Sequence, residues 1–113
     1  MRSVEGTLLD IDRAGRLALR FVEGVPDARA FAADEKTRAA ALHQLLVMGE
    51  AVKRLPDAFR QAHPAVPWRQ IAGMRDVLIH AYDDVDEAEV WRTLVVDLPG
   101  VLAEIEPLLP TPP

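Results

Sequence analysis

The chain of 113 residues is half hydrophobic and 27% charged, a balance typical of one folded domain rather than of a disordered chain. It has no cysteine, which excludes disulfides, thiolate zinc sites and iron–sulfur clusters. No apolar run is long enough to cross a membrane, and Asp10 and Asp12 stand where a signal peptide needs apolar residues. We therefore expect a cytoplasmic protein.

The net charge of −5 is unevenly distributed along the chain. Residues 36–75 carry seven basic and two acidic side chains, a balance of +5, whereas residues 76–113 carry one basic and nine acidic side chains, a balance of −8. A basic middle followed by an acidic end is compatible with a local polyanion site or with self-association through opposite patches. Charges that solvate the outer faces of helices explain most of this asymmetry.

Apolar residues recur at helical spacing through the N-terminal half. A first helix is predicted near residues 5–23, and its apolar stripe comprises Leu8, Ile11, Ala14, Ala18 and Phe21. After a loop or helical turn at 25–33, Asp34 is a suitable N-cap for a long helix over 34–55, which Pro56 ends. The stripe of this helix comprises Ala41, Leu45, Met48, Val52 and Leu55.

The C-terminal half continues the helical pattern. A minor helix is expected near 57–63, and Pro67 suits the first turn of a helix over 68–81. An acidic run then begins the last helix, over 86–108, in which Pro99 must produce a kink or a break. The residues expected to face inward are Ile71, Met74, Leu78 and Ile79 in the first of these long helices, and Val90, Leu94, Leu98, Leu102 and Ile105 in the second.

Two stretches rich in β-branched residues, VLIH at 77–80 and TLVV at 93–96, could form strands instead. Both fit inside longer helical stripes, and neither is bounded by turn residues on both sides. The sequence therefore predicts an all-α fold, an up-and-down bundle of four main helices plus a short helix. We expect one helical domain over residues 1–109 and a frayed tail at 110–113.

The segment RDVLIHAY, residues 75–82, contains most of the side chains that could perform chemistry. Arg75 and Tyr82 would share a helix face, whereas His80 lies about 140° around the helix from Arg75. Asp76, four residues before His80, can hydrogen-bond the imidazole and orient it. A functional site is one interpretation of this segment. The other is that His80 caps the end of the helix while Tyr82 packs at the end of the bundle.

Other candidates carry weaker signals. Glu50 either lines a cleft or is a solvated helix glutamate, and His43 and His63 lack the spacing of metal ligands. The acidic run at 83–87 lacks the glycine and the later glutamate of a calcium-binding loop, so its carboxylates are interpreted as helix-start acids. No motif of nucleotide-binding folds or of serine hydrolases is present. We expect neither a metal nor a cofactor.

The pattern R-x4-H-x-Y formed by Arg75, His80 and Tyr82, followed by an acidic turn, resembles the HepT-like branch of the HEPN superfamily. The resemblance runs in order along essentially the whole chain. Its most specific parts are GEA at 49–51 and PWRQIAGMRD at 67–76. Glycine is common in the family where Ala81 stands here, and an aromatic residue is frequent where Asp83 stands.

The resemblance implies an all-α homodimer in which the motifs of two subunits line one cleft, with the helix that carries RDVLIHAY at the interface. It implies the toxin of a type VII toxin–antitoxin pair, a metal-independent endoribonuclease with Arg75 and His80 as catalytic residues, supported by Asp76 and Glu50. The implied partner is an MntA-like nucleotidyltransferase antitoxin, which silences the toxin by adding AMP to Tyr82.

A second hypothesis is a catalytically inactive HEPN dimer that binds a nucleotidyltransferase or a nucleotide. The intact Arg75, His80 and Tyr82 favour the nuclease. The acidic net charge and Asp83 favour the binding module, because an acid beside the motif would repel phosphate.

Overall fold

The computed structural model describes residues 2–80 and 86–111, and for residues 75–80 it describes the backbone only. The described residues form helices and no strand, which confirms the all-α prediction. The helical elements in chain order are α1 (Val4–Phe21), α2 (Ala28–Ala33), α3 (Glu35–Lys53), α4 (Asp57–Ala62), α5 (Trp68–His80), α6 (Glu87–Arg92), the π-helical turn η2 (Thr93–Asp97), α7 (Leu98–Ile105) and the 3-10 turn η3 (Glu106–Leu108). No helix within the described residues is both long enough and apolar enough to cross a membrane.

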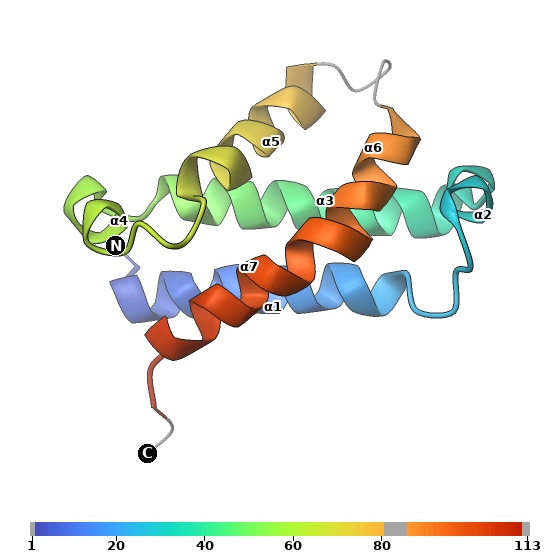
Figure 1. Ribbon diagram of the computed structural model, residues 1–113. Helices are drawn as coiled ribbons and strands as arrows, with labels where there is room; N and C mark the ends of the chain where they lie inside the picture. Colours follow the sequence, from blue (N-terminus) through green and yellow to red (C-terminus); the bar gives the residue numbers. More distant parts are fainter. Residues whose placement is uncertain (1, 81–85, 112–113) are drawn as a thin grey trace.

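Two long antiparallel helices, α1 and α3, form the centre of the molecule (Figure 1). The helix α5 packs on α3 and rises away from it toward its C-terminal end, whereas α7 crosses α1. The short helices α2 and α6 meet at one end, where the rings of Phe31 and Trp91 lie 5.5 Å apart. Residues distant in sequence therefore share one core, which lies between the α1–α3 pair and the C-terminal helices.

The first helix follows its predicted stripe with one exception. Leu8, Ile11, Ala14 and Ala18 are buried, but Phe21 is 38% exposed, so the prediction that it continues the buried stripe is wrong. Phe21 is the last residue of α1, so it belongs to the terminal turn of the helix. The contact between α1 and α7 is close, because a Cβ added at Gly15 would lie 2.7 Å from Cδ2 of Leu102.

The boundaries of α3 agree with the sequence prediction. The Asp34 carboxylate accepts hydrogen bonds from the backbone N–H and the hydroxyl of Thr37, and this caps the helix. All five residues of the predicted stripe are buried, and Pro56 follows the end of the helix. Where the sequence predicted a loop or a helical turn, the short helix α2 forms, capped by Asp27, whose carboxylate accepts from the N–H of Ala30 at 2.9 Å.

The last helical segment accommodates its proline with a π turn. Asp86 caps α6 as predicted, and the stripe from Val90 to Ile105 is buried. The N–H of Leu98 donates to the carbonyl of Thr93, five residues earlier, so the chain is locally wider just before Pro99. The wider turn accommodates the ring of Pro99 and its missing N–H donor. The predicted kink or break at Pro99 is thus a π turn in the structure. The TLVV stretch forms most of this turn and is not a strand.

Candidate functional site

The helix α5 carries Arg75 and His80 of the R-x4-H-x-Y motif, together with Asp76. Its backbone is helical through Arg75, Asp76 and His80, so VLIH is helical rather than a strand. On this helix Arg75 and His80 lie about 140° apart and about 7.5 Å along the axis, whereas Asp76 and His80 share a face. Tyr82 lies outside the described residues, as do Asp83 and Asp84.

The start of α5 is fixed by Trp68. Its side chain is 5% exposed, and its indole N–H donates to the carbonyl of His63 at 2.9 Å. The ring of Phe59, from α4, lies 6.2 Å from that of Trp68 and 4.6 Å from that of His63. This cluster ties α4, the following loop and α5 together, and it makes His63 a residue of the core edge rather than a ligand. A firm anchor at the first turn sets the direction of the helix that carries the motif.

Glu50 lies on α3, the helix against which α5 packs, and its side chain is exposed. Its neighbours Gly49 and Ala51 are buried. The exposed side of α3 at this point is thus available to a cleft, but an exposed glutamate also fits a solvated position. His43, on the same helix, is exposed as well.

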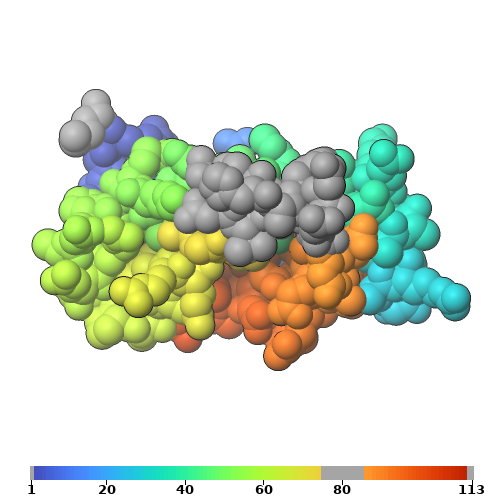
Figure 2. Space-filling view, turned by 90° about the horizontal axis from the view of Figure 1, so that it is seen from above, coloured from blue at the N-terminus to red at the C-terminus, as the bar shows by residue number. Residues whose placement is uncertain are grey.

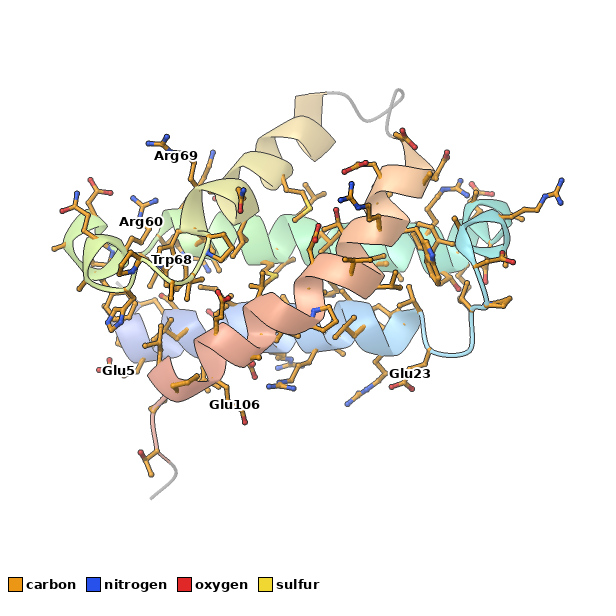
Figure 3. The ribbon with its side chains drawn as sticks, in the orientation of Figure 1. Glu5, Glu23, Arg60, Trp68, Arg69 and Glu106 are labelled. Atoms are coloured by element: carbon orange, nitrogen blue, oxygen red, sulfur yellow. The ribbon has the colours of Figure 1, made fainter. Side chains whose placement is uncertain are left out.

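A basic groove of about 700 Å³ lies between α4 and the first half of α5. Two guanidinium groups line it, from Arg60 and Arg69, together with the amides of Gln61 and Gln70 and the carboxylate of Asp57, which Arg60 contacts. Figure 3 shows Arg69 extending outward from α5 and Arg60 lying between α4 and α5. Both arginines belong to the basic middle of the chain, but no sequence pattern joins them into a site. The charge balance of residues 36–75 was the signal that could have found them.

A second groove, of about 690 Å³, separates α5 from η2 and α7. In Figure 2 it is the hollow between the yellow surface of α5 and the orange surface of α6 and η2. Its apolar lining includes Ile71, Met74 and Val96, and Val96 is 61% exposed. The acidic side chains that line it are Glu89, Asp97 and Glu104. The motif helix therefore has a basic groove on one side and an acidic, partly apolar groove on the other.

Metal-binding geometry is not found in the described parts of the chain, since no three histidine or carboxylate side chains there gather closely enough to hold an ion. The acidic run that the sequence assigns to a helix start begins outside the described residues. Asp86 fits that role, because its carboxylate accepts hydrogen bonds from the backbone N–H groups of Ala88 and Glu89. The next residue, Glu87, forms an ion pair with α3, in which its Oε1 lies 3.8 Å from Nε of Arg38.

Comparison with known proteins matches the chain over nearly its whole length. The family profile described as "Ribonuclease HepT-like" matches residues 11–108. "Probable ribonuclease HepT" of Thermococcus cleftensis is 39% identical over 107 residues, which cover 95% of this chain and 96% of that protein. "Putative RNase MJ0125" of Methanocaldococcus jannaschii is 37% identical over 108 residues, which cover 96% of this chain and 92% of that protein. No solved structure matches the chain significantly.

These matches define a class of helical protein whose relatives carry ribonuclease names, and the matched region includes all of α5. The chain belongs to the ribonuclease HepT-like family, of the HEPN type, and the resemblance inferred from RDVLIHAY is confirmed.

Proposed function

We propose that the protein is a metal-independent endoribonuclease whose active site is the C-terminal half of α5. The observation that carries this proposal is that Arg75, Asp76 and His80 lie on one uninterrupted helix inside the region matched by a ribonuclease family. In this account Arg75 binds the phosphate at the cleaved bond, and His80 acts as general acid or base. Asp76, one turn before His80, orients the imidazole.

The side chains of the motif are sufficient for this chemistry because RNA supplies its own nucleophile. The 2′-hydroxyl attacks the adjacent phosphorus, the 5′-oxygen of the next nucleotide leaves, and a cyclic phosphate remains. A histidine that takes the proton from the 2′-hydroxyl, or gives one to the 5′-oxygen, accelerates the reaction by about 10²–10⁴-fold. The planar fork of Arg75 matches the charge that develops on the phosphate oxygens.

A second subunit completes the site in this proposal. Arg75 and His80 stand about 140° apart on one helix, so the groups of a single helix do not converge on one phosphate. Two copies of α5 facing each other would supply two histidines, which can divide the roles of acid and base. The proposed homodimer is therefore a requirement for activity.

The proposed biological role is that of the toxin of a type VII toxin–antitoxin pair. Tyr82 follows His80 by two residues, so AMP added to its hydroxyl by an MntA-like nucleotidyltransferase would bring an anion and a bulky base close to Arg75. RNA would then be excluded by charge and by volume. Co-expression with an MntA-like nucleotidyltransferase should add AMP to Tyr82, whereas Tyr82→Phe should escape silencing. Modification at another residue would contradict this role.

The nuclease chemistry is tested by comparing an RNA with its 2′-O-methyl counterpart in the presence of EDTA. We expect cleavage of the unmodified strand only, with products that end in a cyclic phosphate. Cleavage of the methylated strand, or strict dependence on a divalent ion, would contradict attack by the 2′-hydroxyl.

A second candidate is a catalytically inactive dimer that binds a nucleotidyltransferase or a nucleotide. The acidic groove beside α5, with Glu89, Asp97 and Glu104 along it, favours this alternative because it repels a polyanion. The same EDTA assay separates the two candidates: a dimer that leaves every RNA intact while it binds its partner supports the binding module.

A further inference from the structure

The groove between α4 and α5 brings two arginines together, one of them exposed and without a partner among the described residues. Arg69 is exposed and, among the described residues, takes part in no hydrogen bond or ion pair. Arg60 on the opposite wall contacts the Asp57 carboxylate through Nη2, while its buried Nε–H has no acceptor in the described part of the chain. Arg69 therefore retains its donors for an incoming anion, whereas Arg60, with Nε buried and a side chain 27% exposed, offers only the exposed part of its guanidinium group.

A glycine in the same groove leaves room for a ligand. Gly73 lies in the middle of α5, where glycine costs about 1 kcal/mol relative to alanine. A Cβ added at Gly73 would meet no described atom within 4 Å, so no described contact requires the small residue. Gly15 shows the opposite case, because Leu102 fills the space that a Cβ would need. Open space over a helix backbone is what a ligand needs in order to approach it closely.

The register of α5 connects this groove to the proposed active site. Arg69, Gly73, Asp76 and His80 follow one another at positions i, i+4, i+7 and i+11, which lie on one face of a helix. From Arg69 to His80 the helix turns by only about 20° more than full turns and advances about 16 Å. A strand that lies along this face in the groove would thus reach the position of His80 a few nucleotides further on.

We propose that the groove binds the sugar–phosphate backbone of the substrate RNA beyond the cleaved bond. Arg69 and Arg60 contact its phosphates, and Gly73 allows the strand to lie against α5. This inference rests on the proposed ribonuclease function. The groove contributes affinity and position, whereas His80 performs the chemistry. Contacts to phosphates carry no sequence information, so the groove should bind RNA of any sequence equally.

The test measures binding of a short labelled single-stranded RNA by fluorescence anisotropy, with His80→Ala as the background that prevents cleavage. In this background Arg69→Gln should weaken binding about fourfold at 0.15 M salt and lower the slope of log affinity against log salt by about 0.7, the loss of one phosphate contact. The matched control is Arg29→Gln on α2, which removes the same charge from an exposed site in another part of the molecule and should change neither value. Equal effects of the two variants would overturn the proposal.

A second pair of variants tests the contact with the helix backbone. Gly73→Ala should weaken RNA binding, whereas Gly100→Ala, at a helical glycine of α7 with equally open space, should not. Weakening by both, or by neither, would contradict a close approach at Gly73.

The alternative occupant of the groove is the acidic C-terminal part of a second copy. If Arg69→Gln changed the mass measured by light scattering from dimer to monomer, the groove would be a protein interface and the proposal would be wrong. The cleavage assay is independent of this result. If cleavage by the otherwise unchanged protein requires His80 while Arg69→Gln binds RNA normally, the groove proposal fails and the proposed function stands.

Discussion

The helices α3 and α5 pack against each other, yet they differ in what they leave uncovered. The whole predicted stripe of α3 is buried. In contrast, α5 buries Trp68 and Ile71 in its first turns, and grooves flank it on two sides. One helix serves as scaffold, and the other is held at its start and flanked by grooves along its first half. Changes in α3 should therefore alter stability, whereas changes on the open sides of α5 should alter binding and activity.

The largest effect on stability is expected in the scaffold. Leu45 of α3 is 0% exposed, so Leu45→Ala would leave a cavity in the core and lower the free energy of unfolding by about 2–5 kcal/mol. Urea unfolding measures this change. A loss below the usual range for a buried leucine would contradict the central place of α3 in the core.

The close contact of α1 and α7 should be nearly as sensitive. Gly15→Ala would place a Cβ 2.7 Å from Cδ2 of Leu102, and we expect a loss of about 1–3 kcal/mol from overpacking, partly offset by better helix propensity. The double variant Gly15→Ala, Leu102→Val lacks the facing carbon. Its denaturant midpoint should therefore be higher than that of Gly15→Ala alone. If the second substitution fails to recover stability, the contact is not the cause.

On α5 the same substitution should act in the opposite direction. Gly73→Ala meets open space, so it should raise the free energy of unfolding by about 0.5–1 kcal/mol. Thermal unfolding measures this change, and Gly100→Ala provides a comparison of the same kind. A destabilised Gly73→Ala would show that something within the protein, such as a second subunit, already occupies that space.

A smaller effect is expected at the cap of α3, where it depends on pH. The hydrogen bond from the Thr37 hydroxyl, with a second from its backbone N–H, lowers the pKa of the Asp34 carboxyl below its ordinary value. The ionised carboxylate therefore stabilises the fold above the ordinary pKa of an aspartate, and this contribution is lost as the pH falls through the lowered value. The free energies of unfolding of the original protein and of Asp34→Ala should differ at neutral pH and converge in acid. A constant difference would contradict the assignment.

Much of this scaffold could be predicted from the sequence because its signals are local. The stripe of α3, the caps at Asp34 and Asp86 and the stop at Pro56 depend on residues within a few positions of each other. The exposure of Phe21 could not be predicted, because it depends on how distant helices pack around the end of α1. The need for a glycine at position 15 comes from the close approach of Leu102, which lies far along the chain. No local sequence pattern indicates such a contact.

The candidate site was predictable only in part for the same reason. RDVLIHAY is a local motif, and the helical register of Arg75, Asp76 and His80 follows from it. The grooves depend on how α5 leaves the surface of α3. Arg60 and Arg69 belong to different helices, and the cluster of Phe59, His63 and Trp68 holds those helices together.

The most direct test of the account compares two histidines of the same protein. His80→Ala should lower the rate of RNA cleavage by about 10²–10⁴-fold, because it removes the proposed acid or base. The matched control His43→Ala, at an exposed position of α3, should cleave at the original rate, and both variants should keep the original melting temperature. Undiminished cleavage by His80→Ala, or an equal loss in His43→Ala, would contradict the central claim that α5 carries the catalytic site.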